Sequence, residues 1–311
     1  MAQPLDWDWA KNISGTGNQE GIAIETDPVS GVIYLSGTWE NDLSSQFPAT
    51  AIPGNDFSST YGKTDGFVAK YDSLGSIVWA FKFGSPEDDG ISALVLDDQG
   101  NIYITGFIGE GTAYFSGNSN HTAESTIENP SGEDFYLAKY NPEGELIWVR
   151  TSVSNGNLSG KDLSVNASAI AATGLYEAKA DFGSLATRRI PNQKDLFVIV
   201  YDTTGSEQWI AETGSNGDDI PEAISLDGNS IFLTGQFDGS LLGIENAAGV
   251  VSANLSNLEY GVNKVFLLSY TVSGDYRWGK IVSGDGEKTA VDIVMDADSL
   301  FIAGHIRGPA F

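Results

Sequence analysis

Short apolar runs separated by polar turns follow one another along the whole chain. Runs of this length, rich in β-branched and aromatic residues, are typical of β-strands. No long stretch of helical period interrupts them, so the pattern predicts an all-β protein. Four of the runs end on a small residue followed by glycine: Val-Ile-Tyr-Leu-Ser-Gly at 32–37, Asn-Ile-Tyr-Ile-Thr-Gly at 101–106, Ser-Ile-Phe-Leu-Thr-Gly at 230–235 and Ser-Leu-Phe-Ile-Ala-Gly at 299–304.

The same unit recurs every 61 to 70 residues, as the spacing of one set of tryptophans shows. A tyrosine lies eight residues before each of the last four of these tryptophans, with a glycine midway, and a second glycine follows each tryptophan by 26 to 28 residues. A fixed period marked by independent residues is the signature of a repeat architecture. The markers are Trp9, Trp79, Trp148, Trp209 and Trp278, with Tyr71, Tyr140, Tyr201 and Tyr270, and with Gly75, Gly144, Gly205 and Gly274.

Each unit contains four short strands joined by tight turns. In the second unit we expect strands at Ile91–Asp97, Asn101–Ile108, Asp134–Asn141 and Glu145–Ser152, with glycine-containing hairpin turns inside the first and the last pair. Four antiparallel strands per repeat, copied radially, predict a β-propeller of four-stranded blades. The recurring tryptophans and tyrosines are then expected to fill the wedges between neighbouring blades.

The chain is expected to form one propeller domain over residues 1–311, with four complete repeats and a composite or truncated fifth. The fifth is either completed by residues 5–13, giving a blade without its third strand, or belongs to a longer propeller of six to eight blades. The third unit lacks a clear turn between its first two strands, within 162–174. The repeats fall at about 21–83, 91–152, 161–213, 221–282 and 288–311 with 5–13.

Charge narrows the classes of partner. The net charge is −26, from 42 acidic and 16 basic residues, and such a surface repels nucleic acid and anionic membranes. The chain has no cysteine, which excludes disulfides and thiol chemistry. No apolar stretch reaches the roughly 18 residues of a membrane span, so we expect no membrane insertion. With nucleic acid and membranes excluded, we expect the partner to be a protein or a glycan.

Loop lengths favour one face of the propeller as a recognition surface. The connections between the second and third strands run over about 39–64, 109–133, 176–194 and 238–263, and they share a face with the acidic blade-to-blade turns. Long connections in a compact domain are usually functional or contain an extra hairpin. We expect this face to expose its aromatic residues, which also include Phe47, Tyr61 and Tyr260. The candidate binding residues are Glu87, Asp88, Asp89, Asp218, Asp219, Asp285, Glu287, Trp39, Tyr114 and Phe115.

The same carboxylates suggest two further interpretations. A glycosidase or lyase would need two carboxylates placed across one bond, yet these acids recur at equivalent positions in several blades, which favours solvation or loop capping. Calcium would suit Asp88, Asp89, Asp218 and Asp219, although no Asp-x-Asp-x-Asp-Gly loop is present. His121 and His305 are the two histidines and make a catalytic triad or a histidine-ligated metal unexpected. We therefore assign no catalytic residue and no cofactor, and expect a non-enzymatic protein.

The residues from Asp65 to Ala80, which read Asp-Gly-Phe-Val-Ala-Lys-Tyr-Asp-Ser-Leu-Gly-Ser-Ile-Val-Trp-Ala, continue to the strand at 101–106. Together they closely resemble the bacterial SBBP-type β-propeller repeat, and the resemblance extends over essentially the whole chain. It implies a secreted or surface-anchored bacterial protein, commonly of Bacteroidetes, and hence an extracellular or cell-envelope location. It also implies a scaffold or adhesion role, either as a binding module or as a structural subunit of a larger envelope assembly.

Overall fold

Apolar strands and glycine-containing turns alternate to build antiparallel sheets, with no helix in the part of the chain that the structure describes. The computed structural model describes residues 9–47, 56–117, 125–129, 131–191, 193–259, 261–282, 286–296 and 299–307. Four blades have four strands each, and one further hairpin follows them. The all-β propeller architecture predicted from the repeats is confirmed.

The strands of each blade pair in chain order from the first to the fourth. The four predicted strands of the second unit each lie within one residue of the observed strand at both ends. Blade 1 is β1 (Gln19–Thr26), β2 (Ile33–Glu40), β3 (Thr64–Tyr71) and β4 (Ile77–Gly84); blade 2 is β5 (Gly90–Leu96), β6 (Ile102–Ile108), β9 (Asp134–Tyr140) and β10 (Leu146–Thr151); blade 3 is β12 (Leu158–Val165), β13 (Ile170–Tyr176), β15 (Asp195–Tyr201) and β16 (Glu207–Gly214); blade 4 is β17 (Asp219–Asp227), β18 (Ser230–Phe237), β21 (Lys264–Thr271) and β22 (Tyr276–Ile281); the last hairpin is β23 (Glu287–Asp296) with β24 (Ser299–Arg307).

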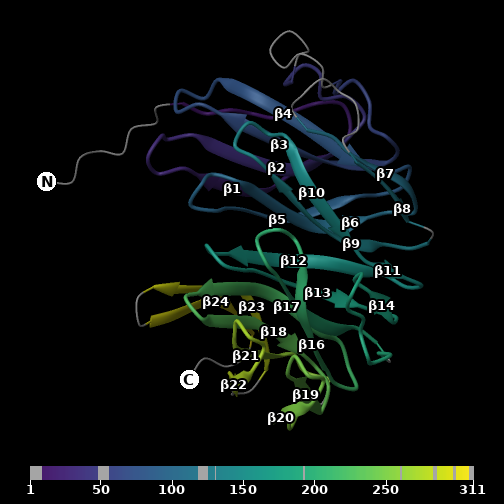
Figure 1. The fold of residues 1–311 in the computed structure, drawn as a ribbon, viewed down its shortest axis with the longest axis vertical. Coiled ribbons are helices and arrows are strands. Elements are labelled where there is room, and N and C mark those ends of the chain that lie inside the picture. Colours follow the sequence, from purple (N-terminus) through teal and green to yellow (C-terminus); the bar gives the residue numbers. More distant parts are fainter. Residues whose placement is uncertain are drawn as a thin grey trace, which may run out of the picture.

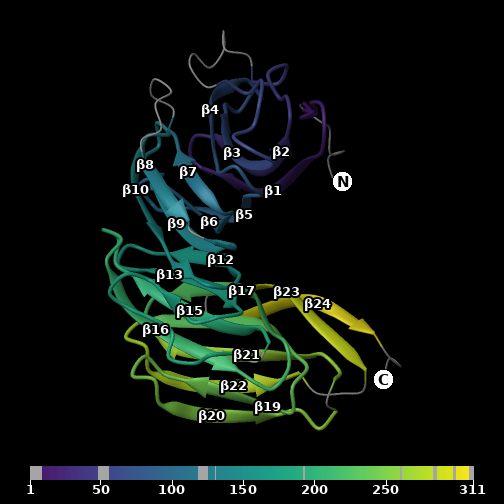
Figure 2. The same ribbon diagram turned by 90° about the vertical axis from the view of Figure 1, so that its right-hand side faces the viewer.

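The blades follow one another in a curved stack (Figures 1 and 2), with blade 1 at one end and blade 4 at the other, and the β23–β24 hairpin lies beside β17. The first strands of consecutive blades lie next to one another along the inner side of this arc, since β5 contacts both β1 and β12, and β17 contacts both β12 and β23. Each first strand contains a β-bulge at the same position, for example between Ile91 and Ala93. A bulge increases the local twist of a strand, which suits a strand at the crowded inner edge of a blade.

Apolar side chains fill the spaces between blades. Between blades 1 and 2, the ring of Phe81 stacks on Tyr140 at 4.2 Å and on Trp79 at 5.5 Å. Equivalent buried clusters join blade 2 to blade 3 and blade 3 to blade 4. The predicted role of the recurring tryptophans and tyrosines as wedge residues is confirmed.

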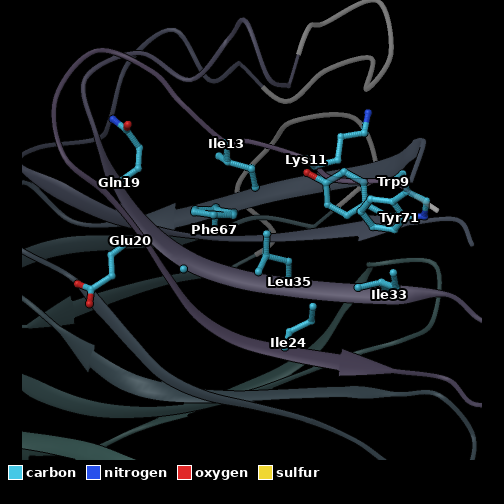
Figure 3. A pocket seen from close by; sticks show the side chains of 11 residues that line it. Trp9, Lys11, Ile13, Gln19, Glu20, Ile24, Ile33, Leu35, Phe67 and Tyr71 are labelled. Atoms are coloured by element: carbon cyan, nitrogen blue, oxygen red, sulfur yellow. The ribbon is translucent and has the colours of Figure 1, made fainter. Parts of the chain in front are cut away.

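Three of the marker tryptophans are also docked onto the following blade, and Figure 3 shows the first of them, Trp9, among side chains of blade 1. A Cβ atom placed on Gly205 would lie 3.0 Å from the indole of Trp148, so that only a glycine lets the ring lie on this turn. The same contact joins Trp9 to Gly75 and Trp209 to Gly274. The recurring glycine and the recurring tryptophan are therefore the two sides of one contact between blades.

Two of these indoles also form a hydrogen bond to the turn on which they lie. The Nε1 of Trp9 donates to the carbonyl oxygen of Ser73 at 3.1 Å, and that of Trp209 donates to the carbonyl oxygen of Val272 at 2.7 Å. Both acceptors lie two residues after the marker tyrosine of the next unit.

The third unit has the turn that the sequence did not make evident. The side-chain Oδ1 of Asn166 accepts hydrogen bonds from the backbone N–H groups of Ser168 and Ala169 at 2.9 and 3.0 Å. An asparagine side chain that bonds the backbone two residues on replaces the glycine turn of the other units. The expectation that this turn is missing from the third unit was wrong.

Substituting Gly205 by alanine tests the contact between tryptophan and glycine. Gly205 has a φ of +83°, and its new methyl group would meet the Trp148 ring. Gly228 is the matched control, because it has a φ of +52° and no atom within 4 Å of an added Cβ. We expect Gly205→Ala to lower the free energy of unfolding by about 1–3 kcal/mol more than Gly228→Ala, measured by urea denaturation. Equal losses would show that positive φ alone matters at this turn.

Candidate functional site

The connections between the second and third strands do not stand free as loops. In blade 2 this connection forms a hairpin, β7 (Gly111–Phe115) and β8 (Ser125–Asn129), which pairs with β4 of blade 1. In blade 4 it forms β19 (Leu241–Glu245) and β20 (Val251–Ser256), which pair with β16 of blade 3. In blade 3 a short β14 (Ala180–Asp181) pairs with β11 (Val153–Ser154), just after blade 2. Each of these three connections thus binds back onto the preceding blade.

This pairing buries aromatic residues that we expected on the surface. Phe115 is fully buried and stacks on Phe83 at 5.4 Å. Trp39 and Phe47 are also fully buried, and both pack against Phe57 in the connection of blade 1. The expectation that Trp39, Phe47 and Phe115 are exposed was wrong, because these rings form the apolar cores beneath the connections. Tyr260 lies outside the described residues.

One aromatic pair remains at the surface of this face. Tyr114 on β7 and Tyr61 in the connection of blade 1 are both partly exposed, and their rings stack at 5.1 Å. The Nζ of Lys82 lies 4.6 Å from the Tyr61 ring centre and donates a hydrogen bond to the carbonyl oxygen of Ser59 at 2.6 Å. A cation held against an aromatic ring in this way stabilises the connection.

Two of the candidate carboxylates are structural caps. Asp89 is 1% exposed, and its oxygens accept hydrogen bonds from the backbone N–H groups of Ser85 and Gly109 at 2.5 and 2.9 Å. Asp219 is fully buried and accepts from the N–H and hydroxyl groups of Ser215 at 2.5 and 2.8 Å. Both carboxylates close the turn that leads into the first strand of a blade. This is the loop-capping role that the sequence favoured over a catalytic role for these acids.

A second set of buried carboxylates escaped the sequence analysis. Asp65, Asp134 and Asp195 begin or nearly begin the third strand of blades 1, 2 and 3, and each is almost completely buried. Burial raises the pKa of Asp65 to about 8, of Asp134 to about 7 and of Asp195 to about 6, in the last case against the opposing effect of Arg189. All three aspartates lie six residues before a marker tyrosine, and this shared position in the repeat could have identified them from the sequence.

Blade 3 holds its connection with a buried charge network. The carboxylate of Glu212 on β16 is fully buried and accepts hydrogen bonds from the backbone N–H groups of Arg188 and Arg189 at 2.7 and 2.8 Å. It also accepts from the hydroxyl of Tyr176 at 3.0 Å. The Arg188 guanidinium reaches Glu245 on the β19–β20 hairpin at 3.5 Å, so that one arginine links blade 3 to a hairpin of blade 4.

An acidic pocket opens where the turns of blades 1, 2 and 3 meet on this face. The cavity of about 210 Å³ is lined by the carboxylates of Glu87, Asp88, Glu110 and Glu133, with Asn157 and two glycines. Burial, Glu177 and Asp88 raise the pKa of Glu133, while Lys194 opposes this effect. We call it the acidic pocket. Sequence reasoning identified Glu87 and Asp88 but not Glu110 and Glu133, which lie at the two ends of one long connection.

The remaining candidates lie at other junctions between blades. Asp218 accepts a hydrogen bond from the backbone N–H of Lys194 at 3.3 Å at the junction of blades 3 and 4. Glu287 is exposed at the start of β23 and forms an ion pair of 3.7 Å with Arg307. Asp285 lies outside the described residues. Among the residues that the structure describes, no three histidine, cysteine, aspartate or glutamate side chains are grouped so as to hold a metal ion.

A larger cavity of about 630 Å³ lies on the opposite face, between the turns of blades 1 and 2. Lys70 lines this cavity, and its Nζ donates to the carbonyl oxygen of Pro142 at 2.8 Å and lies 5.2 Å from the Tyr34 ring centre. Glu25 lines the same cavity, and burial raises its pKa. Sequence reasoning missed this cavity because the turns around it are short.

The buried aspartates make stability depend on pH. Asp65 binds its proton more tightly in the folded chain than at its ordinary pKa of 3.8, so its contribution to stability is complete below about pH 4 and is lost as the pH rises toward 8. In the unchanged chain the backbone N–H of Tyr61 donates to Oδ2 of Asp65 at 2.7 Å. The substitution Asp65→Asn keeps an oxygen acceptor for this N–H and removes the titrating carboxyl group. We expect this variant to lose less stability than the unchanged chain between pH 5 and pH 8 in thermal melts. The exposed Asp98→Asn is the control, and an equal pH slope in all three proteins would contradict the assignment.

Comparisons with known proteins leave the family of this chain open. No family model matches the chain. A stretch of 239 residues, 69% of this chain, is 23% identical to an uncharacterised WD repeat-containing protein of Acanthamoeba polyphaga mimivirus, and it spans 17% of that protein's length. The solved structure of the Dos1 propeller matches with a TM-score of 0.34 and 8% identity over 92% of this chain and 90% of its own.

No described segment forms a helix long and apolar enough to cross a membrane. The four-stranded blades and the sequence repeat show a β-propeller repeat protein.

Proposed function

We propose that the chain is a non-catalytic interaction module that binds a positively charged protein segment at the acidic pocket. The observation that carries this proposal is the convergence of four carboxylates, from one blade-to-blade turn and both ends of one connection, around a single cavity. Lys63 pairs with Glu87 at its edge, while Asp88 and Glu110 are exposed to an incoming partner. A net charge of −26 adds a long-range attraction for cations.

The alternatives have weaker support. A glycan-binding surface would use aromatic rings with open faces, and on the long-connection face Trp39, Phe47 and Phe115 are buried. A glycosidase or lyase would use a carboxylate pair, yet Asp89 and Asp219 are hydrogen-bonded within their own turns. The secreted or envelope location, and a role within a larger assembly, rest on the resemblance to the SBBP-type repeat and form part of the same proposal.

Neutralising the pocket tests the proposal. We expect the triple variant Asp88→Asn, Glu110→Gln, Glu133→Gln to bind a fluorescent lysine-rich peptide about 3–10-fold more weakly than the unchanged chain at low salt, since exposed charges contribute a few tenths of a kcal/mol each. Fluorescence anisotropy gives the dissociation constants, and the difference is expected to shrink in 0.5 M salt because salt screens exposed charges.

A variant with the same change in net charge separates the pocket from the overall field. Asp98→Asn, Glu143→Gln, Glu145→Gln alters three acids in the two hairpin turns of blade 2, on the opposite face. We expect it to retain most of the affinity. Equal weakening by both triple variants would mean that only net charge matters and would overturn the site, and binding of a neutral glycan panel with no response to the peptide would favour the glycan alternative.

A further inference from the structure

The tripeptide Ser-Asn-Gly occurs twice, at the same place in two consecutive turns between blades. It occupies residues 154–156 between blades 2 and 3, and residues 215–217 between blades 3 and 4. Asparagine is a chemically labile residue, and it is most reactive before glycine, which has no side chain to hinder attack by its own backbone nitrogen. Because the local sequence of the two turns is identical, a difference in their reactivity comes from the folded structure.

The backbone nitrogen that would attack forms the same hydrogen bond in both turns. The N–H of Gly156 donates to the Oγ of Ser154 at 3.1 Å, and the N–H of Gly217 donates to the Oγ of Ser215 at 3.1 Å. The two nucleophiles are therefore alike in their bonding, and the asparagine side chains make the difference between the turns.

The two asparagine side chains differ in what holds them. The Oδ1 of Asn216 accepts hydrogen bonds from the backbone N–H and the hydroxyl of Ser240 at 2.9 and 3.1 Å. In the connection of blade 3 the place of Ser240, five residues after the glycine of the second strand, is taken by Lys179, which has no hydroxyl. The Asn155 side chain is exposed and forms no hydrogen bond with another residue that the structure describes.

The glycines of the two turns also differ in the room around them. Gly217 is buried, and a Cβ atom placed on it would lie 1.9 Å from the Oδ1 of Asp238. Gly156 is half-buried, and a Cβ atom placed on it would lie 2.8 Å from the Cβ of Ala178. Closing a ring between asparagine and glycine rotates the side chain and the peptide bond toward each other, so the tighter turn around Gly217 opposes this movement more strongly.

We propose that Asn155 is a site of spontaneous modification, at which the asparagine converts into aspartate and isoaspartate. The backbone nitrogen of Gly156 bonds to the Cγ of Asn155, and the proton of that nitrogen passes through water to the side-chain amide, which leaves as ammonia. The resulting five-membered succinimide takes up one water molecule, which opens the ring at either of its two carbonyls. One opening gives aspartate, and the other gives isoaspartate, in which the main chain runs through the side-chain carbon.

The modified residue lies beside the acidic pocket. The carbonyl oxygen of Gly156 approaches Gly132 so closely that a Cβ atom on Gly132 would lie 3.2 Å from it. Gly132 and Asn157 both line the acidic pocket. Asn155 is neutral, whereas both products carry a negative charge. The conversion therefore adds charge next to the pocket, and its consequence for a cationic partner rests on the function proposed above.

Peptide mapping by mass spectrometry follows the reaction at both sites of the intact chain, since each conversion adds about one mass unit. In the folded chain at mildly alkaline pH, we expect Asn155 to convert about 10-fold faster than Asn216, because two hydrogen bonds hold the Asn216 side chain. In concentrated urea, where neither turn is folded, we expect the two rates to be equal. Asn155→Gln is the control, because the larger ring that glutamine would form closes far more slowly, and it should leave the rate at Asn216 unchanged.

Equal rates in the folded chain would overturn the proposal. A faster reaction at Asn216 would overturn it as well, since the donors of Ser240 would then stabilise the oxyanion of the attack instead of holding the amide away from it. Ser240→Ala gives a second measurement, because it keeps the backbone donor and removes the hydroxyl. We expect it to raise the rate at Asn216 about 3-fold, and an unchanged or lower rate would contradict the assignment.

Peptide binding separates this inference from the proposed function. We expect Asn155→Asp to bind the lysine-rich peptide about 2-fold more tightly than the unchanged chain at low salt, because it adds one exposed charge. Asn216→Asp has the same net charge at the junction of blades 3 and 4, and we expect it to leave the affinity unchanged. Equal tightening by both variants would exclude a local effect of residue 155 on the pocket. Failure of all three proteins to bind the peptide would overturn the proposed function, while the mass measurement would still decide whether Asn155 is modified.

Discussion

The contact between a marker tryptophan and the glycine turn of the next blade, seen for Trp9, Trp148 and Trp209, governs how the blades follow one another. The indole reaches across the gap between two sheets and lies on a turn where a glycine leaves room for it, as Trp148 does on Gly205. A flat ring pressed on a turn sets both the separation and the rotation of the two blades, while the apolar cluster beneath it supplies the hydrophobic stabilisation. Without it the sheets could still form, but their relative placement would rest on less directional packing.

The long connections add a second tie between blades, and this tie decides where a partner can bind. Hairpins such as β7–β8 extend the sheet of the preceding blade and place rings such as Phe115 in its core. Buried charges hold these connections from within, through Lys82 in blade 1 and Glu212 in blade 3. The part of this face that stays accessible to a partner is small and polar. For this reason the acidic pocket at the junction of three blades is the candidate site.

The fold was predictable to within a residue in the second blade because strand pattern, turn glycines and marker rings all repeat, and each repeat supports the others. The site was predicted only in part. Trp39 lies near the end of β2 and Phe115 at the end of β7, both beside polar stretches, and nothing in their local sequence shows that the long connections cover these rings. Glu110 and Glu133 are 23 positions apart, and only the folded connection brings them to one cavity.

The sequence by itself determined the strands, their order within a blade and the residues at the blade interfaces, because these follow from local pattern and from a strict repeat. Tertiary structure alone decided which polar groups are buried. Asp89 and Asp88 are neighbours in the sequence, yet one is a buried cap of a turn and the other faces solvent at the acidic pocket. Whether a carboxylate is buried or exposed depends on how closely a neighbouring blade approaches it. Burial removes the carboxylate from water, and this desolvation raises its pKa, whereas an exposed carboxylate keeps its charge for a partner.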